Sequence, residues 1–265
     1  MRTESTGYTK TKPANPVLSV VAKFLQNYWG ILLVLGLWEA VVIGRQLNSI
    51  VLPTPEDVVL AVIQNPILYL TNFLSTAWVA LVGLAIGAVI GTTLAIISWS
   101  SRILSGVLTP LGLMFASIPV VAIIPILARL LGYETKTVLA IVSILSFFPF
   151  FVYTSTGLRM LPPGGHDLVS VIGTSRLRYL RHLSLPAALP SWCTAMRLAG
   201  PNAVLAAMVA EFLMATPGLG TLLSQASEDL NKAVALGASL VATVVSVMLF
   251  HLAQHLEKRV HAAWK

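Results

Sequence analysis

Residues 167–186 read DLVSVIGTSRLRYLRHLSLP, a polar and arginine-bearing segment that stands between long apolar stretches of the chain. Prolines and glycines at 162–165 precede it, so a helix can begin with Asp167 in its first turn, where a carboxylate suits the helix dipole. At helical spacing one side of this segment collects the residues Leu168, Val171, Ile172, Ser175 and Tyr179. Arginines at 176, 178 and 181 form a basic rim, and such an amphipathic helix either lies on lipid headgroups or docks on another protein.

The surrounding composition is that of an integral membrane protein. Of the 265 residues 56% are hydrophobic and only 10% are charged, and the mean hydropathy is +0.84. A bilayer core needs roughly 20 apolar residues per helical span, and about six runs of that length occur. We predict spans over residues 28–46, 73–98, 107–131, 137–158, 189–214 and 234–256. They leave no room for a separate soluble catalytic domain, so the prediction is one all-α polytopic domain without internal repeats.

Lysines and arginines set the predicted orientation, because cytoplasmic loops retain positive charge. With residues 1–27 as a cytoplasmic tail, most basic residues fall inside the cell, and both termini are expected to be cytoplasmic. The outer loop at 48–72 contains no lysine or arginine. The net charge of +7 therefore reflects membrane topology, and its scattered distribution argues against nucleic acid as a partner.

Glycines and prolines mark the predicted helix contacts. Gly83, Gly87 and Gly91 recur every four residues and allow a neighbouring backbone to approach one face of the second span. Five prolines interrupt the third, fourth and fifth spans, and each favours a bend or break, which membranes tolerate where the freed carbonyls face protein or a water-filled cavity. These helices are candidates to line a translocation path, with the candidate residues Ser117, Pro119, Pro125, Pro149 and Pro201; Pro110 is the remaining proline of the five.

Three ionisable residues lie within predicted spans and are candidates for function: Glu39, Arg197 and Glu211. Arg197 and Glu211 are separated by about 21 Å along one helix, so they cannot pair directly. Each is expected either to bond to a neighbouring helix or broken backbone or to contact solute. His251 and His255 stand four residues apart but lack further ligands, so no metal site is predicted.

The opening segment resembles a known signature. Asp167, with Leu168 and Val169, is followed by Gly173 at the spacing of the glutamate-alanine-alanine and glycine positions in permease subunits of binding-protein-dependent ABC importers. Leu183 and then the Leu185–Pro186 pair stand where that signature has isoleucine and leucine-proline. The triplet departs from the family pattern, because only its acidic character survives at Asp167.

Further pieces resemble the nitrate, sulfonate, taurine and bicarbonate branch of that family. They are the stretches LPTP at 52–55, IP at 118–119 and 124–125, FP at 148–149, AE at 210–211 and GLG at 218–220. The resemblance runs from about Trp38 to the C-terminus. It implies a permease domain over residues 28–265, of the type I importer kind, in which the loop at 159–188 is the cytoplasmic coupling loop.

The resemblance also implies partners and residue roles. Such permeases pair with a second permease subunit, for which we expect a homodimer and leave a heterodimer open. They also pair with two cytoplasmic ATPases that hold ATP and Mg²⁺, and a binding protein outside the bacterial inner membrane delivers the solute. The residues implied to contact the ATPase are Asp167, Leu168, Val171, Ile172, Gly173, Ser175, Arg176, Leu183, Leu185 and Pro186. The sequence has no G-x-x-x-x-G-K-[ST] string, so no phosphate-binding P-loop and no cofactor are expected in the chain itself.

Other function classes remain as alternatives. A secondary carrier or channel uncoupled from ATP would also use broken helices and buried charges. A membrane scaffold would show no flux. An intramembrane enzyme is disfavoured, because no G-x-S-G or H-E-x-x-H string occurs. The resemblance implies a small solute, and the expectation is an organic or inorganic anion such as a sulfonate, taurine, nitrate or bicarbonate, to which Arg197 points. The same branch also handles neutral or heterocyclic precursors, so that alternative stays open.

Overall fold

The computed structural model describes residues 16–160 and 175–263, and all regular structure in those two ranges is helical. Four of the described helices are long and apolar enough to cross a membrane: Pro66–Ser100, Thr135–Gly157, Arg176–Met214 and Lys232–Val260. Two shorter apolar helices span Trp29–Gly44 and Val120–Leu131. The all-helical membrane architecture expected from composition is therefore confirmed.

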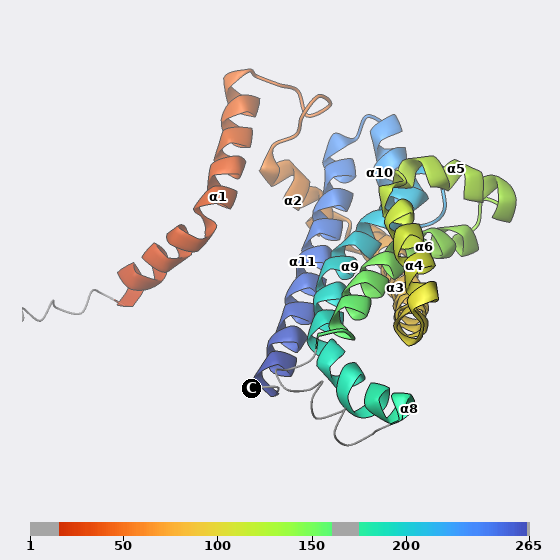
Figure 1. Ribbon diagram of the computed structural model, residues 1–265. Coiled ribbons are helices and arrows are strands. Elements are labelled where there is room, and N and C mark those ends of the chain that lie inside the picture. The colour runs from red at the N-terminus through yellow and green to blue at the C-terminus, as the bar shows by residue number, and fades with distance from the viewer. Residues whose placement is uncertain (1–15, 161–174, 264–265) are drawn as a thin grey trace, which may run out of the picture.

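The core of the bundle is built from α3 (Pro66–Ser100), α6 (Thr135–Gly157), α9 (Leu185–Met214) and α11 (Lys232–Ala263). Helix α3 packs along α6, α6 packs against α9, and α9 packs against α11. α1 (Pro16–Gly44) stands apart from this bundle in Figure 1 and is joined to it through α2 (Pro55–Gln64). The side chain of Trp38 ties the end of α1 to this connection by donating a hydrogen bond from Nε1 to the Pro53 carbonyl at 3.0 Å.

The glycine stripe on α3 lies against α6, as its spacing predicts. A Cβ added at Gly83 would stand 2.6 Å from a methyl group of Val142, and one at Gly87 would stand 2.6 Å from the Ser146 Cβ. At Gly91 it would meet the backbone of Phe147. The two helices therefore approach closely because these positions lack side chains.

The single span predicted over residues 107–131 is wrong in one respect. The chain forms α4 (Arg102–Ser117) and then α5 (Val120–Leu131), with an interruption at Ile118 and Pro119. Proline lacks an amide hydrogen and disfavours helical geometry at the preceding residue, which explains the end of α4. The other interior prolines do not end a helix, since α4, α5, α6 and α9 continue through Pro110, Pro125, Pro149 and Pro201.

Several helices extend beyond the predicted spans. α1 begins at Pro16, within the predicted tail, and α3 begins at Pro66. The fifth membrane helix begins early as well, because α8 (Arg176–Tyr179) continues through a π-helical segment, η1 (Leu180–Ser184), into α9. Hydrophobicity marks only the part of a helix that matches the bilayer, whereas a helix continues until a proline, glycine or turn ends it.

Candidate translocation path and coupling segment

A cavity of about 520 Å³ lies where α5, α6 and α9 meet, and we call it the central cavity. The break at Pro119 directs α5 onto α6 and α9, so that its first residues form one wall. The lining residues are Val120, Val121, Leu145, Asn202, Leu205, Ala206 and Val209. Among these described residues Asn202 is the only one with a polar side chain, and its amide makes no hydrogen bond.

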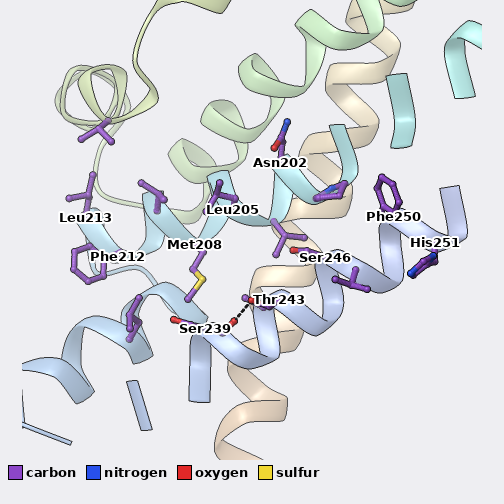
Figure 2. Close-up of a pocket in the computed structure, with 17 residues that line it drawn as sticks. Asn202, Leu205, Met208, Phe212, Leu213, Ser239, Thr243, Ser246, Phe250 and His251 are labelled. Carbon is purple, nitrogen blue, oxygen red and sulfur yellow. Dashed lines mark hydrogen bonds between the residues drawn. The ribbon is translucent and has the colours of Figure 1, made fainter. Parts of the chain in front are cut away.

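A larger groove of about 970 Å³ adjoins the central cavity between α9 and α11. Figure 2 shows its walls, with Asn202, Leu205 and Met208 on α9 and Ser239 and Thr243 on α11. Four residues line both spaces: Val121, Asn202, Leu205 and Val209. The Thr243 hydroxyl already donates to the Ser239 carbonyl at 2.8 Å, so part of the polar surface of α11 is satisfied within its own helix.

The structure brings only some of the path candidates to these spaces. Pro201 lines the groove, and Pro119 directly precedes the two valines of the central cavity. Pro125 is exposed and Pro149 is half-buried, and neither lines the cavity or the groove. Ser117 is the last residue of α4, and its side chain lies outside the described part. The sequence analysis did not select Asn202 as a candidate. The feature that could have indicated it is a carboxamide side chain directly after Pro201 in a predicted apolar span.

Arg197 pairs with a carboxylate from another helix. Its Nε lies 3.1 Å from Oε2 of Glu257 on α11, in an ion pair without a directed hydrogen bond. The Thr194 hydroxyl donates to the other carboxylate oxygen of Glu257 at 2.6 Å, and the Arg197 guanidinium stands 5.7 Å from the centre of the Phe250 ring. The Glu257 side chain is itself buried. Pairing with Arg197 offsets the cost of that burial.

Glu211 is almost fully buried and connects three helices. Its Oε2 accepts hydrogen bonds from the Thr76 hydroxyl on α3 at 2.8 Å and from the Gly220 amide at 3.0 Å. The Thr76 hydroxyl oxygen in turn accepts from the Leu219 amide at 2.8 Å. The carboxylate therefore caps the N-terminus of α10 (Leu219–Glu228) from the side of α9, where the helix dipole favours negative charge.

The two glycines around Leu219 make this close approach possible. A Cβ at Gly218 would overlap the Glu211 carboxyl group, and one at Gly220 would overlap the Met208 carbonyl. This contact gives a physical reason for the spacing of Glu211 and the GLG stretch at 218–220. Arg197 and Glu211 thus bond to neighbouring helices or backbone, which was one of the two expected alternatives, and neither lines the central cavity or the groove.

Half of the predicted coupling residues belong to the described part. Ser175 and Arg176 are exposed at the start of α8, while Leu183, Leu185 and Pro186 are half-buried where the segment enters the bundle. Pro186 lies in the first turn of α9, where proline is tolerated. The other predicted coupling residues, Asp167, Leu168, Val171, Ile172 and Gly173, lie outside the described residues.

The segment Arg176–Ser184, which we call the lever, also contacts the end of α3. The rings of Tyr179 and Trp99 stack with their centres 5.6 Å apart. Arg176 reaches the carbonyl of Ser100 at 3.5 Å, where the C-terminal end of α3 favours a cation. The lever is thus continuous with α9 and in contact with α3.

Comparison with known proteins places the fold in a family. The model of the family described as binding-protein-dependent transport system inner membrane component matches residues 83–262. The chain is 33% identical to the formylaminopyrimidine transport permease protein ThiX of Halalkalibacterium halodurans over 193 residues, which cover 71% of this chain and 76% of that protein. It is 28% identical to the putative aliphatic sulfonates transport permease protein SsuC of Escherichia coli, covering 85% and 86% of the two chains.

The structure is also similar to one chain of a solved ABC transporter. A chain from the inward-facing MetNI methionine ABC transporter superposes with a TM-score of 0.65 at 17% identity, covering 73% of this chain and 96% of that one. The family consists of membrane components of bacterial importers that work with ATPase subunits and a binding protein, and these components are not themselves catalytic. The chain therefore belongs to the binding-protein-dependent transport system inner membrane component family and is the multi-pass permease subunit of an ABC importer.

Proposed function

We propose that this permease carries a small solute through the central cavity by alternating access, driven by ATPase subunits that bind the coupling loop at 159–188. The central cavity is the observation that carries this proposal. It lies beside the Pro119 break, it is walled by three different helices, and it places the unpaired amide of Asn202 within a membrane helix. An unpaired amide is costly against lipid but not in a space that holds water or solute.

The lever supports the proposed coupling. Because it runs without interruption into α9, a displacement by a bound ATPase would tilt the helix that carries Asn202 and Pro201. Its stacking on Trp99 would carry the same displacement to α3. We propose that the exposed residues Ser175 and Arg176 and the five candidates from Asp167 to Gly173 contact the ATPase, and that Leu183, Leu185 and Pro186 fix the lever to the bundle.

The proposed assembly contains two ATPases, a second copy of this permease and an outer binding protein. In Figure 1 α8 and the end of α11 lie at one end of the bundle, and α10 and α5 lie toward the other. The first end carries the cations Arg102, Arg159, Arg176, Arg178, Arg181, Lys258 and Arg259. This distribution supports a cytoplasmic location for the lever and for both termini. A second copy facing α9 would close the open side of the cavity.

The names of the similar permeases indicate which solutes this protein is expected to carry. They include formylaminopyrimidine, aliphatic sulfonates, nitrate and bicarbonate. The expected role of Arg197 in holding an anion receives no support from its contacts, since Glu257 already neutralises it. The proposal therefore names a small organic or inorganic solute from this range, and the anionic members rest on the relatives alone.

Reconstitution tests this function. The permease, its ATPase and its binding protein are placed together in proteoliposomes, and solute uptake and ATP hydrolysis are measured. Uptake that requires ATP supports the proposal. Uptake by the permease alone that follows an ion gradient would establish the alternative of a secondary carrier, and no flux at all would favour a scaffold.

The coupling loop gives the first testable prediction. Gly173→Trp places a large side chain where close approach to the ATPase is proposed, so we expect ATP hydrolysis to continue while ATP-driven uptake is lost. Gly106→Trp is the matched control, because space is open around that α4 position. Normal uptake and ATPase binding in the Gly173 variant would contradict the assigned coupling role.

A further inference from the structure

A third cavity, of about 650 Å³, lies at the end of the bundle that carries the lever, and we call it the interfacial cavity. Its walls come from the last turn of α3, the first turn of α4 and the lever. It shares no lining residue with the central cavity or the groove. The lining residues are Trp99, Ser100, Ser101, Arg102, Ile103, Arg176 and Tyr179.

Positive charge gathers at this cavity from several elements. Arg102 begins α4 and Arg176 begins the lever, and both residues are exposed. In the described part of the chain neither guanidinium forms an ion pair, and Arg176 reaches only the Ser100 carbonyl at 3.5 Å. Arg159 adds a cation one turn further along α4, where it donates to the Ser105 hydroxyl at 2.8 Å. Such a cluster without a described carboxylate partner favours an anionic ligand.

The backbone at the start of α4 adds further donors. The helical hydrogen bonds begin with the Ser105 amide, which donates to the Ser101 carbonyl at 3.0 Å, so the amides of Arg102 and Ile103 precede them. The helix dipole adds partial positive charge at the same place, where phosphate groups commonly bind. Arginine also binds phosphate through two parallel hydrogen bonds. Side chains and backbone together therefore suit the oxygens of a phosphate group.

The rest of the lining suits the level at which lipid headgroups meet acyl chains. The stacked rings of Trp99 and Tyr179 are of the two residue types that are enriched at membrane–water interfaces. An apolar face of α4 begins within the cavity at Ile103, which is 80% exposed. Val107, Leu111 and Met114 continue this exposed face at helical spacing. A charged group and an apolar face thus adjoin within one turn of α4, as a phospholipid requires.

We propose that the interfacial cavity binds the phosphate of an anionic phospholipid of the surrounding membrane. Arg102 and Arg176 hold the phosphate, and Ile103 contacts the acyl chains. Basic pockets between membrane helices bind the headgroups of anionic lipids through this combination of contacts. The lipid bridges α4 and the lever, so the anionic lipid content of the membrane affects how firmly the lever is held. The inference depends neither on the solute nor on the orientation of the chain.

The ATPase is the competing occupant of this cavity. Arg176 is also proposed to contact that partner, and carboxylates of the ATPase would neutralise the same arginines. The apolar face of α4 next to Arg102 favours lipid, because a water-soluble ATPase brings no acyl chains to cover Ile103.

The test uses the purified complex of permease and ATPase in detergent. Dioleoylphosphatidylglycerol and dioleoylphosphatidylcholine are titrated separately, and native mass spectrometry gives the dissociation constant of each retained lipid. We expect phosphatidylglycerol to bind about tenfold more tightly than phosphatidylcholine. Arg102→Gln should weaken phosphatidylglycerol binding about tenfold, since a hydrogen bond to a charged group is worth at least that factor. Arg102→Lys keeps the charge but not the bidentate geometry, so its dissociation constant should lie between the two.

Arg181→Gln is the matched control, because it removes the same charge from the lever at an exposed residue that does not line the cavity. It should leave the dissociation constant unchanged. Equal weakening by Arg102→Gln and Arg181→Gln would overturn the inference, since the lipid would then respond only to overall charge. Displacement of the lipid by excess inorganic phosphate at constant ionic strength would overturn it in favour of a soluble anion. Loss of the ATPase from the Arg102→Gln complex, with lipid binding unchanged, would assign the cavity to the ATPase instead.

Discussion

Glu211 shows how one buried carboxylate holds a junction of helices. It accepts from the Thr76 hydroxyl on α3 and from the Gly220 amide of α10, while belonging to α9 itself. The Gly220 amide therefore depends on this side chain, while the Thr76 hydroxyl also lies 3.2 Å from the Asn72 carbonyl. An unsatisfied buried donor costs about 1–3 kcal/mol, so the contact is energetically significant.

Removal of this carboxylate gives a prediction about stability. Glu211→Ala leaves the buried Gly220 amide without its acceptor and removes the shorter contact of the Thr76 hydroxyl, which also lies 3.2 Å from the Asn72 carbonyl. We therefore expect thermal unfolding in detergent to occur several degrees lower, at about 2–4 °C per kcal/mol. Glu134→Ala is the control, because Glu134 forms only an exposed ion pair with Lys136 at 3.0 Å. Equal melting temperatures for both variants would rule out the capping role.

A second residue-scale prediction concerns Arg197 and Glu257. Glu257→Gln leaves the half-buried guanidinium of Arg197 unpaired, and we expect lower stability and lower uptake. In the double variant Arg197→Gln with Glu257→Gln no charge remains, so both properties should recover in large part. A double-mutant cycle with melting temperature and uptake measures the coupling. Loss of uptake in a stable double variant would instead show that Arg197 contacts solute.

At the scale of elements, α3 and α6 approach closely through the glycine stripe. Gly87→Leu should destabilise the bundle by about 1–3 kcal/mol, because a Cβ there would stand 2.6 Å from the Ser146 Cβ and 2.8 Å from the Ser143 carbonyl. Gly36→Leu on α1 meets nothing within 4 Å and should be tolerated. The melting temperatures of the two variants test this prediction. Comparable decreases in melting temperature would mean that the glycine stripe is not a tight contact.

The sequence predicted these elements unequally well, for physical reasons. The glycine stripe was predictable because spacing along one helix determines which residues share a face. The break at Pro119 was only one of five proline-based alternatives, since whether a proline bends or ends a helix depends on its neighbours. Glu257 and Asn202 were missed, because the contact of Glu257 with Arg197 links residues 60 positions apart and the cavity around Asn202 requires three helices at once.

At the scale of the whole molecule, the distribution of charge predicts an orientation that labelling can test. Cys193 is the sole cysteine and is buried, so Cys193→Ala provides a background for introduced cysteines. In intact cells, a membrane-impermeant maleimide should label Glu228→Cys on α10, whereas Arg181→Cys on the lever should react only after the membrane is opened. Labelling of the lever in intact cells would show the opposite orientation.

The π-helical segment at Leu180–Ser184 has a consequence for how the molecule transmits rotation. A π-helical turn holds one more residue than an α-helical turn, and each residue of an α-helix turns the chain by about 100°. The rotation about the helix axis between the arginine side chains of the lever and the face of α9 that carries Asn202 is therefore set within these five residues. A gain or loss of one residue there would leave the side chains of both surfaces unchanged. It would nevertheless rotate the lever relative to α9 by about 100°, so that the two surfaces no longer face the directions they have now.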